Sequence, residues 1–155
     1  MKQNAEVYIS YAWGDKTKKG RQRQVVFDDV FKVLGDSKLD VIVDFEAIKY
    51  KDSISKFMAK LGTASYVVII VSDKYLKSKS CMFEVTQILQ RKELHKRVYP
   101  LILGDVDIYS SSGIKSYLEY WQTQINVLEE QINSMENKSY ARPIYEELDL
   151  FHEIR

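Results

Sequence analysis

The stretches YVVIIVS (residues 66–72) and VYPLIL (residues 98–103) decide the fold. Each is nearly continuous in apolar residues over the length of one β-strand. Such runs are typical of strands covered on both faces, as in a parallel sheet. Two further runs of strand length lie upstream, at residues 7–11 and 39–44. The proline at position 100 interrupts the fourth run, which predicts an edge position or a bulge.

The segments between these runs have helical length and period. Residues 24–34, 53–61 and 81–94 each place apolar side chains on one face. Strand and helix therefore alternate along the chain. This alternation predicts an α/β domain with a central parallel sheet of four to five strands, right-handed crossovers and helices on both faces. In such sheets, ligands bind beyond the carboxyl ends of the strands.

The last third of the chain has a different pattern. Apolar residues recur there at steps of four and three: Ile114, Leu118, Trp121, Ile125, Leu128, Ile132 and Met135. This stripe predicts one long helix, which we expect to cap the core rather than to form a coiled coil. Residues 144–155 are again helical in pattern and stop without a terminator. We expect a core at residues 1–108 and a packed helical extension at 109–155 that leads to a further domain.

Composition excludes several classes of function. The 155 residues include 23 Lys and Arg against 22 Asp and Glu, so the formal charge is +1. This balance gives no reason to expect nucleic acid or an acidic membrane as a partner. The single cysteine, Cys81, excludes an internal disulfide and favours a reducing compartment. No signal peptide or membrane-length apolar run is visible, so the predicted location is the cytoplasm.

Most familiar catalytic motifs of α/β proteins are missing. The sequence contains no Gly-x-x-x-x-Gly-Lys phosphate loop, no Gly-x-Gly-x-x-Gly after the first strand and no Gly-x-Ser-x-Gly elbow. Two histidines and one cysteine argue against a metal site, and we expect none. What remains are polar and aromatic segments at the predicted carboxyl ends of three strands. They are YISYAW at residues 8–13, DFEAIKYKDS at 44–53, and SDKYLKSKSCMFE at 72–84.

In this order, these segments resemble the Toll/interleukin-1 receptor (TIR) domain over roughly residues 5–105. Residues 8–11 look like the first family motif, a hydrophobic pair followed by Ser-Tyr. Residues 44–53 resemble the loop after the second strand, with its leading acid and its Asp-Ser ending. Residues 72–84 resemble the bacterial pattern Ser-x-x-Tyr-Leu-x-Ser-x-x-Cys-x-x-Glu. The resemblance implies a flavodoxin-like fold.

The resemblance to bacterial members also implies hydrolysis of NAD⁺, with Glu84 as the catalytic residue. Chemistry supports a single glutamate for this reaction. The bond between nicotinamide and ribose breaks through an oxocarbenium-like state, and nicotinamide leaves as a neutral molecule. One carboxylate can then stabilise the charge that develops at the anomeric carbon, whereas ordinary glycosides need a second carboxyl group as an acid. We expect Glu84 near the start of its helix, where backbone amides favour an anion.

Further residue roles follow from the same resemblance. Self-assembly would activate the enzyme, in a bacterial defence or signalling protein with a fused or associated sensor domain. NAD⁺ is then the substrate, and no cofactor is expected. The expected substrate-binding residues are Ser10, Tyr11, Trp13, Asp44, Phe45, Ile48, Lys51, Ser80 and Cys81, and the expected self-association residues are Phe45, Tyr50, Lys51 and Asp52. Ser80 stands where the family often has Trp, which puts one wall of the pocket in question. Lys51 stands where the family often has Gly, which puts the opening of the loop in question.

Other functions fit parts of the pattern. A non-enzymatic TIR–TIR interaction module would keep the fold without the chemistry, and Ser80 favours it mildly. A phosphoacceptor receiver domain shares the strand–helix alternation but needs paired acids after its first strand, where this chain has Ser10-Tyr11-Ala12. A nucleoside deoxyribosyltransferase-like enzyme would also use a glutamate, on nucleosides. Glu84 itself, judged by residue type alone, is an ordinary solvated helix residue.

Overall fold

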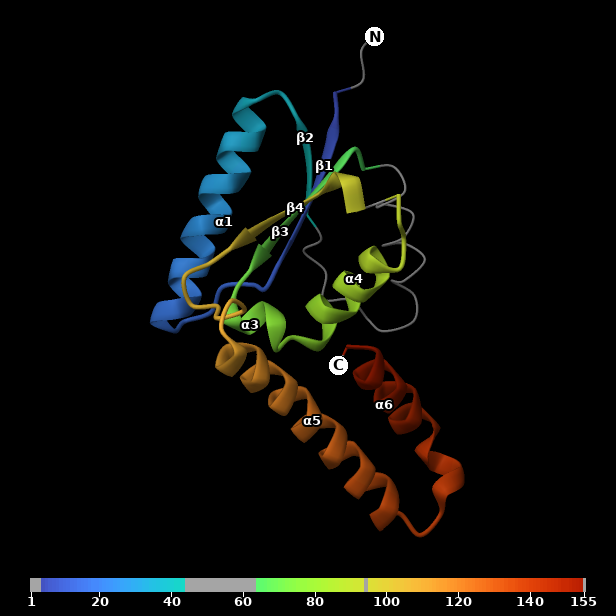
Figure 1. Cartoon of the computed structure of the whole chain (residues 1–155). Helices are drawn as coiled ribbons and strands as arrows, with labels where there is room; N and C mark the ends of the chain where they lie inside the picture. The colour runs from blue at the N-terminus through green and yellow to red at the C-terminus, as the bar shows by residue number, and fades with distance from the viewer. Residues whose placement is uncertain (1–3, 44–63, 94, 155) are drawn as a thin grey trace.

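The computed structural model describes residues 4–43, 64–93 and 95–154, and it confirms the α/β alternation (Figure 1). The strands are β1 (Glu6–Tyr11), β2 (Asp40–Val43), β3 (Tyr66–Val71) and β4 (Val98–Ile102). The helices are α1 (Lys18–Asp36), α3 (Asp73–Leu76), α4 (Lys79–Leu89), α5 (Ser111–Ser134) and α6 (Arg142–Ile154), with short 3-10 turns η1 (His95–Arg97) and η2 (Lys138–Ala141). The predicted helix at residues 53–61 lies outside the described residues.

The four strands form one parallel sheet in the order β2-β1-β3-β4. The chain moves from β1 to one side through α1, then crosses back to β3 on the other side. The strand order therefore reverses between β1 and β3, and the crevice beyond their carboxyl ends is where such sheets bind ligands. This topology brings together the motifs that follow β1 and β3.

Helices cover both faces of the sheet, as predicted. Alternate residues of a strand point to opposite faces. Tyr8 of β1 and Val67 of β3 belong to a buried cluster with Ile88 of α4. Ile9 lies one position after Tyr8 in β1, and Ile70 lies three positions after Val67 in β3, so both point to the opposite face. There they pack with Phe27 of α1. The central strands are therefore buried on both sides, which explains their continuous apolar sequence.

Helix α1 begins earlier than the apolar period predicted, at Lys18 instead of residue 24. Thr17 caps it by accepting a hydrogen bond from the Gly20 backbone. A Cβ atom at position 20 would overlap the Asp15 carboxylate, so glycine permits this tight entry. The first turn is polar because it lies beyond the sheet, and for that reason hydrophobic periodicity alone could not find it.

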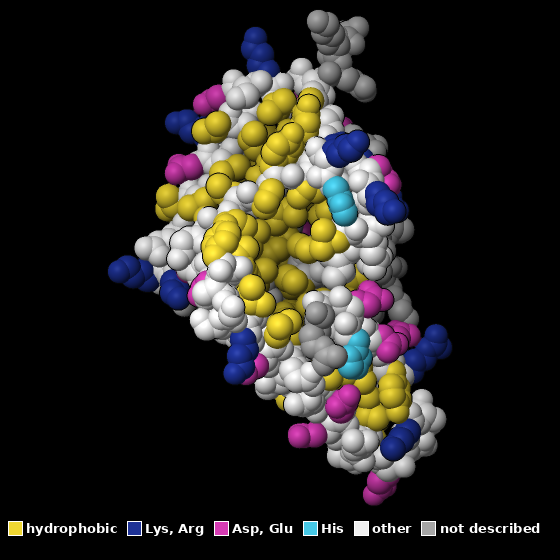
Figure 2. All heavy atoms as spheres, viewed as in Figure 1, with side chains coloured by type: hydrophobic (Ala, Val, Ile, Leu, Met, Phe, Trp, Pro, Cys, Tyr) yellow, Lys and Arg dark blue, Asp and Glu magenta, His cyan; other side chains and the backbone are white. Residues whose placement is uncertain are grey.

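Strand β4 differs from the prediction that it is covered on both faces. It lies at an edge of the described sheet, and Tyr99 and Leu101 are 54% and 40% exposed. Figure 2 shows hydrophobic side chains gathered over this region, between α1 and α4. The Leu103 N–H bonds to Val71 of β3, so by alternation the nitrogen of Pro100 faces the free edge. Proline there removes a donor from the open edge, and the predicted edge position is confirmed.

The reason for this exposure is that α5 does not return over the sheet. It extends away and pairs with α6, and the two helices pack on α4 (Figure 1). Trp121 and Ile125 of the predicted stripe are buried with Phe83 of α4 and Phe151 of α6. Ile114, at the start of the stripe, remains 46% exposed. The long helix is thus packed within the chain, and its partners are helices and not the sheet.

Two isoleucines of α5 test this packing. Ile125 is 1% exposed, so Ile125→Ala should lower the free energy of unfolding by about 2–5 kcal/mol. Ile114→Ala on the same helix should cost less than about 1 kcal/mol, because its side chain is half exposed. Urea unfolding followed by circular dichroism measures both. Equal losses in the two variants would contradict the described packing of α5.

Candidate functional site

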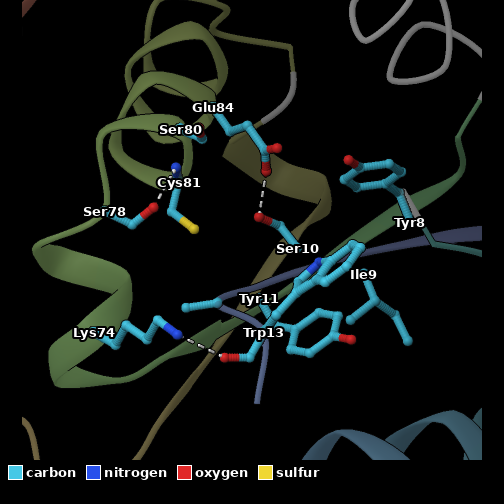
Figure 3. A pocket seen from close by; sticks show the side chains of 11 residues that line it. Tyr8, Ile9, Ser10, Tyr11, Trp13, Lys74, Ser78, Ser80, Cys81 and Glu84 are labelled. Carbon is cyan, nitrogen blue, oxygen red and sulfur yellow. Dashed lines mark hydrogen bonds between the residues drawn. The ribbon is translucent and has the colours of Figure 1, made fainter. Parts of the chain in front are cut away.

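A cavity of about 220 Å³ opens at the carboxyl ends of β1 and β3, at the point where the strand order reverses (Figure 3). Its walls come from two stretches of chain. One is the end of β1 with the loop after it, and the other runs from α3 into α4. The lining residues are Tyr8, Ile9, Ser10, Tyr11, Ala12, Trp13, Lys74, Ser78, Ser80, Cys81 and Glu84. The structure therefore brings together Ser10, Tyr11, Trp13, Ser80, Cys81 and Glu84 from the predicted site.

The carboxylate of Glu84 is the central polar group of this cavity. The residue is only 8% exposed. The Ser10 hydroxyl donates a hydrogen bond of 2.5 Å to Glu84 Oε2 and so joins β1 to α4. A buried carboxylate is costly unless it is hydrogen-bonded or paired. The strand end therefore both stabilises the acidic group and sets its direction.

Tyr75 extends this interaction into the core. Its hydroxyl lies 2.8 Å from Ser10 Oγ, and the residue is fully buried. Since a serine hydroxyl has one hydrogen and Ser10 gives it to Glu84, the Tyr75 hydroxyl must be the donor to Ser10. Burial, followed by the nearby Cys81 and Glu84, raises the pKa of Tyr75 well above its usual value. Tyr75 thus keeps its proton and remains a donor over the whole neutral range.

Glu84 does not lie next to the backbone amides at the N-terminus of α4. Helix α4 begins at Lys79, after the cap Ser78, so Glu84 is in the second turn. The favourable effect of a helix N-terminus falls off within the first turn. The expectation that backbone amides of α4 stabilise Glu84 is therefore wrong, and Ser10 supplies a side-chain donor in their place.

The two aromatic residues at the end of β1 and just after it have different surroundings. The ring of Tyr11 stacks on Phe27 of α1, with centroids 4.0 Å apart and an interplanar angle of 13°. One face of that ring is thereby occupied by the core of the α1 side. Trp13 is 45% exposed at the cavity (Figure 3). Of these two residues, Trp13 is the better placed to stack on a ligand.

Lys74 is a site residue that the sequence analysis did not select. Its ammonium donates to the Trp13 carbonyl at 3.2 Å and to Asp15 Oδ2 at 3.0 Å. Asp15 Oδ2 also pairs with Arg23 of α1 at 2.8 Å. Hydrogen bonds from Thr17, with the contact to Lys74, lower the pKa of Asp15. The only signal for Lys74 in the sequence was its place three residues after the end of β3, at the carboxyl edge.

Arg23 differs from the other basic residues at the start of α1. Lys18, Lys19 and Arg21 are exposed. Arg23 is 6% exposed because its side chain turns inward to Asp15. The loop after β1 is therefore fixed from two sides, by α1 through Arg23 and by α3 through Lys74.

Comparison with known families agrees with these motifs. A family model described as the TIR domain matches residues 7–135, which is most of the chain. This chain belongs to the TIR domain family. A search of curated proteins gives no match.

The TIR match includes both walls of the cavity and continues through α5. The flavodoxin-like sheet and the residues that line the cavity thus belong to the matched region. None of the described helices combines the length and apolarity needed to cross a bilayer. Likewise, the described residues include no group of three or more His, Cys, Asp or Glu that could hold a metal ion.

Several predicted site residues of this TIR domain lie outside the described residues. They are Asp44, Phe45, Ile48, Tyr50, Lys51 and Asp52, from the segment after β2. Their substrate-binding and self-association roles remain predictions. Ser80, by contrast, is described as an exposed residue at the cavity, in the first turn of α4.

Cys81, an expected substrate-binding residue, is a buried free thiol in the cavity wall. It is 8% exposed, and burial is the main reason that its pKa rises to about 12. Its backbone N–H bonds to the Ser78 hydroxyl, which caps α4. At neutral pH the thiol is protonated and is a poor nucleophile. Cys81 therefore shapes the cavity wall rather than supplying a reactive group.

Alkylation tests this assignment. At pH 8, a thiol with a pKa near 12 holds roughly a thousandfold less thiolate than one at the ordinary value of about 8.5. Native protein should therefore react with iodoacetamide about a thousandfold more slowly than protein in urea. Mass spectrometry gives both rates, and Cys81 is the only cysteine, so the signal is unambiguous. Similar rates in the two states would show that Cys81 is accessible and ionised.

Proposed function

We propose that this TIR domain is an NAD⁺ glycohydrolase in which Glu84 is the catalytic residue. The observation that carries the proposal is the buried carboxylate of Glu84, oriented by Ser10 in a cavity at the strand-order reversal. In the proposed reaction, NAD⁺ and water give ADP-ribose, nicotinamide and a proton. Attack by a group of ADP-ribose itself, in place of water, would give the cyclic product.

Glu84 acts on the charge that develops as the bond breaks. The C1′–N1 bond electrons pass to the nicotinamide ring, which leaves neutral, and positive charge appears on the ribose C1′ and ring oxygen. A carboxylate placed against the ribose interacts more strongly with this state than with the ground state, which is the condition for catalysis. The Tyr75–Ser10–Glu84 chain keeps that carboxylate in one orientation without reorganisation.

The cavity has room for one end of the proposed substrate. At about 220 Å³, it is below the range of about 300–1,000 Å³ usual for drug-sized ligands. It therefore suits the nicotinamide and its ribose, with the rest of the dinucleotide outside. Trp13 would stack on an aromatic ring at the mouth, and Lys74 would face the diphosphate. Lys74 already shares Asp15 with Arg23, so it can turn toward a phosphate while Asp15 keeps a cationic partner.

Self-assembly and attached domains belong to the same proposal. A site that encloses only part of its substrate gains from further walls, and a second copy contacting the segment after β2 would supply them. Phe45, Tyr50, Lys51 and Asp52 are the proposed contact residues. An associated sensor domain would then bring several copies of the TIR domain together, in a defence or signalling role in the cytoplasm.

A non-enzymatic TIR–TIR interaction module is the second candidate. Ser80 favours it, because a small polar side chain lines the cavity at the position where the resemblance calls for Trp. In that case Glu84 and Ser10 would join α4 to β1 for structural reasons alone. The two candidates differ in one measurable property, the release of nicotinamide.

Glu84→Gln tests the proposed enzyme. We expect concentrated wild-type protein with a crowding agent to release nicotinamide, and the variant to be at least roughly a hundredfold slower, because one electrostatic contact to the transition state is lost. Glutamine keeps the size and accepts the Ser10 hydrogen bond, so the fold should survive. Chromatographic detection of nicotinamide measures the rate.

Glu129→Gln is the matched control, since Glu129 is an exposed residue of α5. It should keep wild-type activity. Equal release by wild type and Glu84→Gln would assign the activity to a contaminant or to another residue. The absence of release from every assembled sample would reject the enzyme and leave the interaction module.

Ser10→Ala tests the orientation of the carboxylate. The variant keeps the strand but removes the hydroxyl that donates to Glu84. We expect kcat to fall roughly ten- to hundredfold with a small change in KM, because misdirection of Glu84 affects the transition state more than binding. Ser134→Ala, at the exposed end of α5, should change neither constant. An unchanged kcat in Ser10→Ala would mean that this hydrogen bond has no part in catalysis.

A further inference from the structure

Helix α5 contacts the segment that joins the two parts of the second cavity wall. Lys74 lies on α3, and Ser78, Ser80, Cys81 and Glu84 lie at or beyond the start of α4. Between them, α3 ends at Leu76, and Lys77 and Ser78 form the break before α4 begins at Lys79. Helix α3 is a single turn of four residues. So short a helix has little stability of its own, and its placement depends on outside contacts.

Three α5 side chains supply such contacts from one face of the helix. The Tyr117 hydroxyl donates to Asp73 Oδ1 at 3.0 Å. The Tyr120 hydroxyl donates to the Lys77 carbonyl at 3.1 Å, and Trp121 Nε1 donates to the Leu76 carbonyl at 2.9 Å. Positions separated by three and four residues lie side by side on a helix. Tyr120 and Trp121 thus bind carbonyls at the end of α3, where helices leave such groups without internal partners.

Trp121 also reaches the helix that carries Glu84. It is 4% exposed and belongs to one buried cluster with Phe83, the residue directly before Glu84, and with Leu150 and Phe151 of α6. Its ring meets Phe151 edge-on, with centroids 5.2 Å apart. On α4, Phe83 is therefore directed to the α5–α6 pair, while Glu84 is directed to the cavity. None of the residues that line the described cavity comes from α5 or α6.

We propose that Tyr120 and Trp121 are positioning residues of the site, which set α3 and α4 against β1 and thereby place Glu84 opposite Ser10. The catalytic part of this inference rests on the proposed glycohydrolase function, whereas the positioning itself does not. A shift of the α5–α6 pair would be transmitted to Glu84 through the carbonyls of residues 76–77 and through Phe83. Tyr120 and Trp121, more than 30 positions after Glu84, the last lining residue in sequence, would thus control the site without contacting substrate.

Conservative variants separate positioning from folding. Tyr120→Phe removes only a hydroxyl, and Trp121→Phe removes the indole N–H while keeping an aromatic ring in the cluster. Tyr140→Phe is the control, because Tyr140 is 76% exposed and lies in η2, away from α3. Urea unfolding of each variant gives the stability against which the other measurements are compared.

The first measurement does not depend on enzymatic activity. Cys81 lies in the first turn of α4 and is 8% exposed, so opening of that turn should make the thiol more accessible. We expect iodoacetamide to label Cys81 at least about tenfold faster in Tyr120→Phe and Trp121→Phe than in wild type, because loss of these contacts favours local opening. Labelling in Tyr140→Phe should be unchanged. If the loss of unfolding free energy measured in urea fully explains the faster labelling of Cys81, the positioning role is overturned.

The second measurement follows nicotinamide release. In Tyr120→Phe and Trp121→Phe, kcat should fall roughly tenfold or more while KM stays within about twofold, since a small displacement of a catalytic group affects the reacting geometry most. Unchanged kcat with faster labelling would show that α5 positions α4 but not Glu84, which overturns the catalytic part. If wild type releases no nicotinamide, the glycohydrolase proposal fails, and the labelling result alone decides the positioning.

Discussion

The hydrogen bond from Ser10 to Glu84 is the interaction on which the site depends. It joins residues 74 positions apart and lies in a buried environment. A carboxylate with 8% exposure would be strongly destabilising without a donor, so the register of α4 against the end of β1 must satisfy it. Tyr75, buried behind Ser10, completes the chain of donors. The same constraint that makes this carboxylate tolerable also directs it into the cavity.

The remaining contacts hold the two walls in place around that bond. Asp15 connects the loop after β1 to α1 through Arg23 and to α3 through Lys74. Helix α5 contacts the break between α3 and α4 from the other side. Each wall is therefore tied to a separate part of the fold, and the cavity lies where these parts meet. A TIR domain arranged in this way can hold one carboxylate in a fixed direction, which is what cleavage of a bond with a neutral leaving group requires.

Local patterns were sufficient for the order of the described elements and for the family. The apolar runs predicted four parallel strands, because a strand buried on both faces is apolar at nearly every position. Pro100 predicted the edge, because proline has no backbone N–H to donate to a neighbouring strand. The ordered motifs led to the TIR family and to Glu84. Errors arose where a segment's surroundings were decided by distant parts of the chain. Tyr99 and Leu101 are apolar but exposed, since the helix after β4 packs on α4 and not on the sheet.

The sequence by itself determined the strand–helix order, the family and the residue types at the carboxyl edge of the sheet, because these depend on periodicity and on motifs a few residues long. Only the tertiary structure decided which donor stabilises Glu84, that Lys74 and Tyr75 belong to the site, and that Tyr120 and Trp121 contact its second wall. These contacts join residues 40 or more positions apart. Their partners are chosen by how helices pack on the sheet, and no local pattern in the chain carries that information.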